Sequence, residues 1–231
     1  MNLSAVKSNF RTDINGLRAI AVCSVILFHF NILGFKGGFI GVDVFFVISG
    51  FLMTGIIMQG IEANKFSVLQ FLLARAARIM PALFILCVVL LLYGVVELIP
   101  PDLEKLGRHA ASSILFFSNL LYIKEFGYFD NNDDKWLLHT WSLSVEWQFY
   151  VVLPFALIIL TKITKSKKLF ELAILLAFLF SITASILLTP SKPTASFFHL
   201  ATRAWELLPE RWFLFTQNVN RVGAFIVKKA I

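Results

Sequence analysis

Five stretches of this chain are each about 20 residues long and almost entirely apolar. They cover residues 17–35, 39–59, 80–99, 142–160 and 169–189. Because about 20 apolar residues are needed to cross the roughly 30 Å hydrocarbon core of a bilayer, each stretch predicts a transmembrane helix. The composition agrees, since 58% of the 231 residues are hydrophobic and only 15% are charged, whereas soluble domains carry about 25% charged residues. We therefore expect an all-α, polytopic membrane helix bundle in contact with a lipid bilayer.

A sixth apolar run, Ala111 to Ile123, is shorter than the others. Its thirteen residues would extend roughly 20 Å as a helix, which is too short to span the hydrocarbon core. The run is therefore expected to form a re-entrant or surface-lying segment within one long outer region, residues 100–141.

The basic residues predict the orientation of the chain. Lys and Arg are concentrated in the cytoplasmic segments of membrane proteins. The N-terminus, the connection around residues 65–78 and the cluster at residues 162–168 all become cytoplasmic if five helices cross. We expect a multi-pass membrane protein with its N-terminus in the cytoplasm.

The net charge of +7 is explained by this asymmetry, and nucleic-acid binding is not expected. Cys23 and Cys87 lie within apolar runs and lack the spacing of a disulfide framework or a metal site. We expect packing roles for both cysteines and no bound metal.

Arg18 and His29 are polar residues within the first predicted span. They are eleven positions apart, which places them on one helical stripe about 16 Å apart along the axis. Arg18 has the alternative of an ordinary residue whose charge reaches the cytoplasmic edge. His29 has the alternative of a structural hydrogen-bonding role, but a neutral imidazole at this position also suits general-base catalysis near pH 7.

Two acidic residues within predicted spans each require a partner. Asp43 lies near the outer start of the second span, where we expect it to pair with a cation or histidine of the first span or to cap its own helix. Glu146 lies in the fourth span, in a polar group with His139, Ser142, Ser144 and Gln148.

Two pairs of charged residues are each spaced by three positions. Arg75 and Arg78 share one helical face just before Pro81, which we expect to open the third helix. Two guanidinium groups in register suit phosphate recognition, with a purely topological role as the alternative. Arg203 and Glu206, beyond the fifth span, are spaced to pair with each other.

Six separated motifs occur in one order along residues 10–208. They are Asp13-Ile-Asn-Gly-Leu-Arg18, Phe28-His29-Phe30, the run from Gly37 to Phe51, Arg75-Ala-Ala-Arg78-Ile-Met-Pro81, the run from His139 to Glu146, and Thr202-Arg-Ala-Trp-Glu-Leu207. Together they resemble the acyltransferase 3 family. This resemblance implies an enzyme of the bacterial inner (plasma) membrane. The enzyme would transfer an acyl group, commonly acetyl, from cytoplasmic acyl-CoA to a hydroxyl of an exported or surface glycan, such as a polysaccharide or lipopolysaccharide.

The resemblance also implies roles for individual residues. The family's Arg-x10-His pair falls on Arg18 and His29, and its cytoplasmic Arg-x-x-Arg pair on Arg75 and Arg78. The Ser-x-x-x-Glu stretch falls on Ser142 to Glu146. The candidate catalytic residues are therefore His29, Arg18, Glu146 and Asp43, and the candidate acyl-CoA-binding residues are Arg75, Arg78 and Arg18.

The chain departs from the family at its end. Residues 1–208 resemble the N-terminal part of a domain that usually has about twice as many spans, whereas residues 209–231 form an atypical tail that fits no span. A truncated product is therefore expected, with a second polypeptide as one source of the missing helices. An inactive remnant and a fragment of a proton-coupled transporter are the alternative interpretations.

Overall fold

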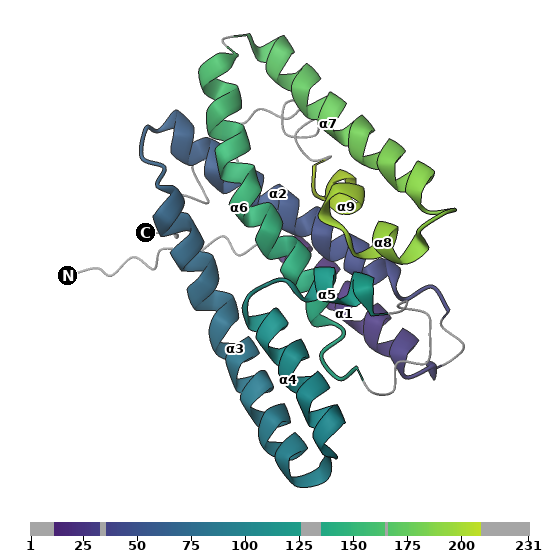
Figure 1. Cartoon of the computed structure of the whole chain (residues 1–231). Coiled ribbons are helices and arrows are strands. Elements are labelled where there is room, and N and C mark those ends of the chain that lie inside the picture. The colour runs from purple at the N-terminus through teal and green to yellow at the C-terminus, as the bar shows by residue number, and fades with distance from the viewer. Residues whose placement is uncertain (1–11, 33–35, 126–134, 165, 209–231) are drawn as a thin grey trace, which may run out of the picture.

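The computed structural model describes residues 12–32, 36–125, 135–164 and 166–208, and within these residues it is helical without a strand (Figure 1). The helices are α1 (Thr12–His29), α2 (Ile40–Glu62), α3 (Val68–Glu97), α4 (Pro100–Ile114), α5 (Ser118–Lys124), α6 (Thr140–Ile163), α7 (Lys167–Leu188), α8 (Pro193–Phe198) and α9 (Leu200–Leu207). The tail at residues 209–231 lies outside the described residues.

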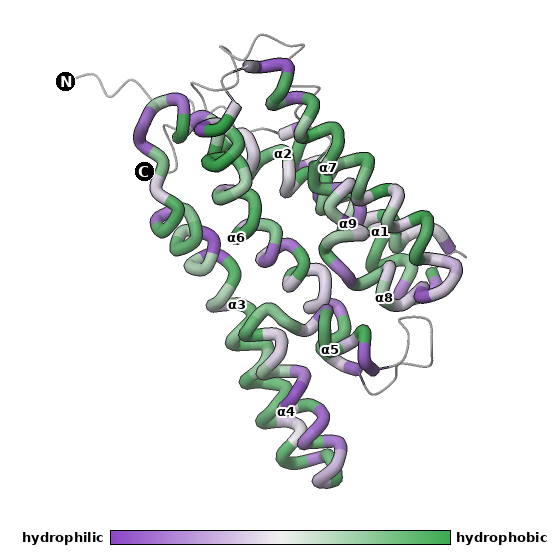
Figure 2. Tube along the Cα trace, turned by 45° about the horizontal axis from the view of Figure 1, so that its top comes forward, coloured by the Kyte–Doolittle hydropathy of each residue, from purple (hydrophilic) through white to green (hydrophobic). Residues whose placement is uncertain are grey.

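Five of the described helices, α1, α2, α3, α6 and α7, are long and apolar enough to cross a membrane. Each overlaps one of the five predicted spans, so the prediction of a polytopic helix bundle is confirmed. The side chains that these helices leave exposed are largely apolar, for example Val96 at 79% and Phe180 at 70%. Figure 2 shows the long helices mostly in the green of apolar residues, with purple hydrophilic positions along α4. Exposed apolar surface on this scale is stable when it contacts lipid.

The third span begins much earlier than predicted. α3 starts at Val68 rather than at residue 80, and the side chain of Ser67 caps it by accepting a hydrogen bond from the Gln70 backbone N–H at 3.4 Å. Pro81 therefore lies inside α3, and the prediction that it opens the helix is wrong. The apolar run was interrupted by Arg75 and Arg78, but arginine is a good helix former. The helix accordingly continues through both residues.

The predicted single segment at residues 111–123 is two helices instead. α4 ends at Ile114 and α5 begins at Ser118. Between them Phe116 has a positive φ of 57°, and its ring stacks on that of Trp147 with centroids 4.4 Å apart. Gln148 donates a hydrogen bond to the Phe116 carbonyl oxygen at 3.0 Å. These contacts to α6 stabilise the break, and neither α4 nor α5 is long enough to be one of the five spans.

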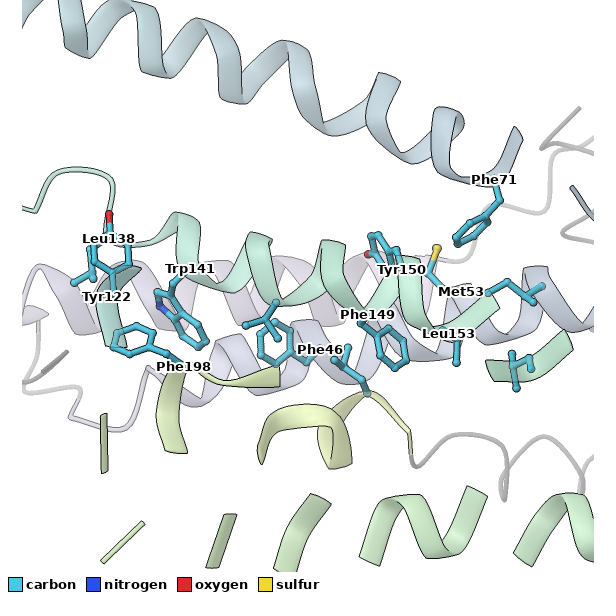
Figure 3. Packing of buried hydrophobic residues seen from close by; sticks show 14 of the residues in the cluster. Phe46, Met53, Phe71, Tyr122, Leu138, Trp141, Phe149, Tyr150, Leu153 and Phe198 are labelled. Carbon is cyan, nitrogen blue, oxygen red and sulfur yellow. The ribbon is translucent and has the colours of Figure 1, made fainter. Parts of the chain in front are cut away.

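α6 lies at the centre of the bundle, between α3 and α7 (Figure 1). Its buried face carries Trp141, Phe149 and Leu153, which pack with Phe46 of α2 in the main hydrophobic core (Figure 3). α6 therefore has fixed neighbours from α2 and from the short helices α5, α8 and α9. This central position lets α6 present residues to most of the other elements.

α8 and α9 fold back into the bundle and pack against α7, α6 and α2 (Figure 1). Ser181, well inside α7, donates a hydrogen bond to the Ala201 carbonyl oxygen at 2.6 Å and accepts one from the Trp205 backbone N–H at 2.9 Å. On the opposite side, Gly50 of α2 lies directly against the backbone of Leu207. The motif that follows the fifth span thus returns to the interior of the bundle.

The close approach at Gly50 leads to a prediction. A Cβ added there would lie 2.1 Å from the Leu207 carbonyl oxygen, so Gly50→Ala is expected to displace α9 and cost about 1–3 kcal/mol of stability. Gly55→Ala on the same helix is the matched control, since its Cβ would meet no described atom within 4 Å. Thermal unfolding of the detergent-solubilised variants provides the measurement. Equal melting temperatures for the two variants would contradict the close packing.

Candidate active site

Glu146 of α6 lies beside two hydroxyl groups. Ser49 of α2 donates a hydrogen bond to Glu146 Oε1, and the Tyr150 hydroxyl lies 3.1 Å from Ser49 Oγ. Because Ser49 has only one hydroxyl proton and gives it to the carboxylate, Tyr150 is the donor to Ser49. Glu146 and Tyr150 are one turn apart on α6, so both face α2. The partner that Glu146 was expected to require is therefore a serine of the second span.

Three arginines from two helices form a cluster that includes this carboxylate and Tyr150. Arg18 of α1 and Arg78 of α3 both lie close enough to Glu146 to interact with its charge. Arg75 in turn interacts electrostatically with Tyr150, Arg78 and Arg18. Arg18 of the Arg-x10-His motif and the pair Arg75 and Arg78 were predicted as separate features, but the structure places them in one cluster.

The arginine cluster has the properties of an anion-binding site. Arg78 and Arg18 both act electrostatically on Arg75, and these like charges repel one another. The Nε atoms of Arg18 and Arg75 are buried and have no hydrogen-bond partner among the described residues. Buried donors without partners are rare in folded proteins, and phosphate oxygens satisfy arginine donors well. The cluster therefore fits a phosphate-bearing ligand.

His29 lies at the other end of α1 and contacts a second histidine. Its ring centroid is 4.4 Å from that of His139, at an interplanar angle of 68°, and 5.1 Å from that of Phe28. His139 is the residue immediately before α6. Removal from water, and then the neighbouring His29, lower the pKa of the His139 side chain. This favours a neutral imidazole at pH 7.

The pairing of His29 with His139 was not predicted. His139 was noted only as one of several polar residues near Glu146. The available signal was the order of charged and histidine residues along two spans. His139 precedes Glu146 by seven residues, about 10 Å along α6, and His29 follows Arg18 by eleven residues, about 16 Å along α1. If the two helices are antiparallel and Arg18 lies near Glu146, the two histidines lie at the same end. Both members of the α1 stripe face α6, so the site is elongated, with the histidines at one end and the arginines at the other.

The prediction that Asp43 pairs with a cation or histidine of the first span is wrong. Its carboxylate accepts a hydrogen bond from Arg203 of α9 at 3.1 Å, not from a residue of α1. Arg203 also pairs with Glu206 at 2.5 Å, as their spacing predicted. Burial raises the pKa of Glu206 to about 7, with Arg203 opposing and Asp43 adding to the shift. The return of α9 into the bundle is what brings Arg203 to Asp43.

Other polar residues of the fourth span serve to hold α5 rather than the site. Ser144 shares a hydrogen bond with Ser118 at 2.7 Å, and Gln148 donates to Asn119 at 2.8 Å. Asn119 in turn donates to the Phe198 carbonyl oxygen at 3.1 Å. Among the described residues, no three His, Cys, Asp or Glu side chains form a group that could hold a metal ion.

The fold and the site define a polytopic membrane protein with an arginine cluster and a histidine pair within one helix bundle. An acyltransferase domain family matches residues 11–215, and the chain belongs to this family. The resemblance seen in the six motifs is thereby confirmed.

Two relatives carry names that describe O-acetyl transfer. The chain is 36% identical to the peptidoglycan O-acetyltransferase OatA of Listeria monocytogenes over 223 residues, covering 94% of this chain and 36% of the relative. It is also 36% identical to the O-acetyltransferase OatA of Staphylococcus aureus over 161 residues, covering 68% of this chain and 26% of the relative. The chain thus spans about a third of the length of the first relative and about a quarter of the second. No solved structure matches it significantly.

Proposed function

We propose that this protein is a membrane O-acyltransferase that moves an acyl group, most simply acetyl, from cytoplasmic acyl-CoA to a hydroxyl of an exported or cell-surface glycan. The observation that carries the proposal is the elongated site, in which an arginine cluster from α1 and α3 and a histidine pair lie at separate positions along α1, both beside the first half of α6. Membership of the acyltransferase family supports the reaction class. The names of the relatives support acetyl as the group transferred.

Arg75, Arg78 and Arg18 are proposed to bind the phosphates of acyl-CoA. Arg75 and Arg18 each have a buried Nε without a described partner, and Arg78 acts on the same carboxylate as Arg18. Glu146 offsets part of the positive charge and, through Ser49 and Tyr150, fixes the position of α6 against α2. The extended arm of the donor then follows the stripe from Arg18 toward His29.

His29 is proposed as the general base. It accepts the proton of the acceptor hydroxyl, whose oxygen forms the new ester bond to the acyl carbon while the thioester C–S bond breaks. The proton is finally transferred to the CoA sulfur, so the products are the O-acyl glycan and free CoA. The neighbouring His139, with its lowered pKa, is suited to remain neutral and to orient His29.

The acceptor is proposed to be a cell-wall or other surface glycan. The Listeria relative is named for peptidoglycan, so peptidoglycan replaces lipopolysaccharide as the first acceptor to test. Peptidoglycan fragments and lipopolysaccharide offered side by side would separate the two.

The orientation is proposed to place the N-terminus in the cytoplasm and the arginine cluster on the cytoplasmic side of the histidine pair. Lys36 lies in the α1–α2 connection and Ser166 lies in the α6–α7 connection, which five crossings put on opposite sides. In a chain with Cys23 and Cys87 replaced by alanine, Lys36→Cys is expected to react with an impermeant maleimide in intact cells. Ser166→Cys is expected to react only after the membrane is opened. The reverse labelling pattern would overturn the orientation.

The function is tested with membranes that contain the protein and with acetyl-CoA radiolabelled in the acetyl group. We expect labelled acetyl to appear on the glycan as an alkali-labile ester, and not in membranes that lack the protein. Acetyl-CoA binding without transfer would indicate an inactive remnant. Glycan-independent proton movement without acetyl-CoA binding would indicate a transporter.

A further inference from the structure

Arg203 contacts carboxylate, carbonyl and aromatic groups outside the proposed site. Its guanidinium group pairs with Asp43 of α2 and Glu206 of α9, and its Nε donates to the Phe197 carbonyl oxygen at 3.0 Å. The same group lies 4.6 Å from the ring centroid of Phe197 and 5.6 Å from that of Trp141. The side chain is only 12% exposed, so α2, α6, α8 and α9 all meet around one cation.

A buried cation of this kind is costly unless it is fully paired. Arg203 meets that condition through two carboxylates, one carbonyl and two aromatic faces, which are the partners a planar guanidinium group accepts best. Glu206 is 1% exposed, and its second oxygen has no hydrogen-bond partner among the described residues. An apolar contact would hold α9 against α2 without the free-energy cost of desolvating charged groups. We therefore interpret the ion pairs as fixing the relative positions of the helices rather than as adding stability.

The aromatic partner connects Arg203 to the histidine pair. Trp141 lies in the first turn of α6, two residues after His139. On its other side, Phe46 meets the Trp141 ring edge-on, with centroids 6.0 Å apart, and Phe46 lies one turn after Asp43 on α2. Arg203 therefore contacts Trp141 directly and, through Asp43, holds the turn of α2 that carries Phe46. Both contacts act at the end of α6 next to His139.

We propose that Asp43, Arg203 and Glu206 form a charge clamp that positions the first turn of α6 so that His139 lies against His29. Arg203 is then a positioning residue, and Asp43 acts through it rather than on the reacting atoms. The proposed effect on catalysis rests on the proposed acyl transfer, whereas the proposed effect on the histidine pair does not.

The structural part is tested by cross-linking in native membranes. Cys23 and Cys87 are replaced by alanine, His29 and His139 by cysteine, and a short bis-methanethiosulfonate joins the two new thiols. Arg203→Met is expected to lower the cross-linked fraction several-fold, because it retains the chain length but loses every polar contact of the clamp. Arg108→Met on α4 is the matched control, since Arg108 is exposed and outside the clamp. It is expected to leave the cross-linked fraction unchanged.

Arg203→Lys keeps the proposal testable if the methionine variant aggregates. Lysine retains the charge but loses the planar fork, so an intermediate cross-linked fraction is expected from protein that remains monodisperse in gel filtration. An unchanged fraction in monodisperse Arg203→Met, or in Arg203→Lys where only that variant folds, would overturn the clamp.

The catalytic part is tested with the histidines intact. Arg203→Lys is expected to lower kcat about tenfold or more while leaving the KM for acetyl-CoA unchanged, because the arginine cluster at the other end of the site is untouched. A raised KM with an unchanged kcat would overturn the positioning role. If the unmodified protein transfers no acetyl group, the proposed function fails, and the cross-linking result alone decides whether the clamp exists.

Discussion

Replacement of His29 by alanine is expected to abolish acyl transfer, by about a hundredfold or more, because general-base catalysis typically contributes at least that factor. Acetyl-CoA binding is expected to persist, since the arginine cluster lies about 16 Å away along α1. The measurement compares transfer of radiolabelled acetyl to glycan with equilibrium binding of acetyl-CoA, both in membranes that contain the variant. A selective loss of transfer would assign His29 to the chemical step.

His199→Asn is the matched control for His29→Ala. His199 immediately precedes α9 and caps it, because its Nδ1 accepts a hydrogen bond from the Ala201 backbone N–H at 3.1 Å. Asparagine preserves such a cap. This control is expected to retain transfer. If His29→Ala transfers acetyl at nearly the unmodified rate, His29 is a structural histidine, and the base would be His139 or a residue outside residues 1–231.

The five spanning helices could be predicted from hydropathy alone. A bilayer requires a long apolar helix at each crossing, so the chemical pattern and the structure are closely linked. The shared face of Arg18 and His29 was also predictable, because helical periodicity within one span is a local property. Both residues face α6 in the structure.

The partners across helices could not be predicted in the same way. Asp43 and Arg203 are 160 positions apart, and they meet only because α8 and α9 fold back between α7 and α2. Hydropathy placed Arg203 outside the membrane region, since α9 is too short to span. Contacts such as that of Gly50 with Leu207 depend on three-dimensional packing that no local pattern reports.

The ends of two helices were predicted wrongly, because hydropathy and helix formation do not change at the same residues. Arg75 and Arg78 interrupt an apolar run, which moved the predicted start of α3 to residue 80, although the helix begins at Val68. The break at Phe116 was missed for the opposite reason. An apolar run continues through it, while its positive φ is stabilised by contacts with Trp147 and Gln148.

The double variant Arg75→Ala, Arg78→Ala is expected to weaken acetyl-CoA binding about a hundredfold or more. Hydrogen bonds to charged groups contribute about 1.5–3 kcal/mol each, and each 1.4 kcal/mol corresponds to about a tenfold change in affinity. The affinity of the unmodified protein is expected to fall as salt is added, and that of the variant to fall less steeply, because fewer charges contact the phosphates. Isothermal titration calorimetry with acetyl-CoA in detergent at two salt concentrations provides the measurement.

Two further variants separate phosphate recognition from general charge. Arg75→Lys, Arg78→Lys retains both charges but not the planar forks, so we expect an affinity between those of the unmodified protein and the alanine variant. Arg108→Ala removes one exposed charge from α4 and is expected to bind acetyl-CoA normally. Arg75 interacts electrostatically with Arg78 and Arg18, and its buried Nε has no hydrogen-bond partner among the described residues, so the loss of the α3 pair is expected to remove the main anchors of the donor. An unchanged affinity in the alanine variant would leave these arginines only the role of orienting the chain in the membrane.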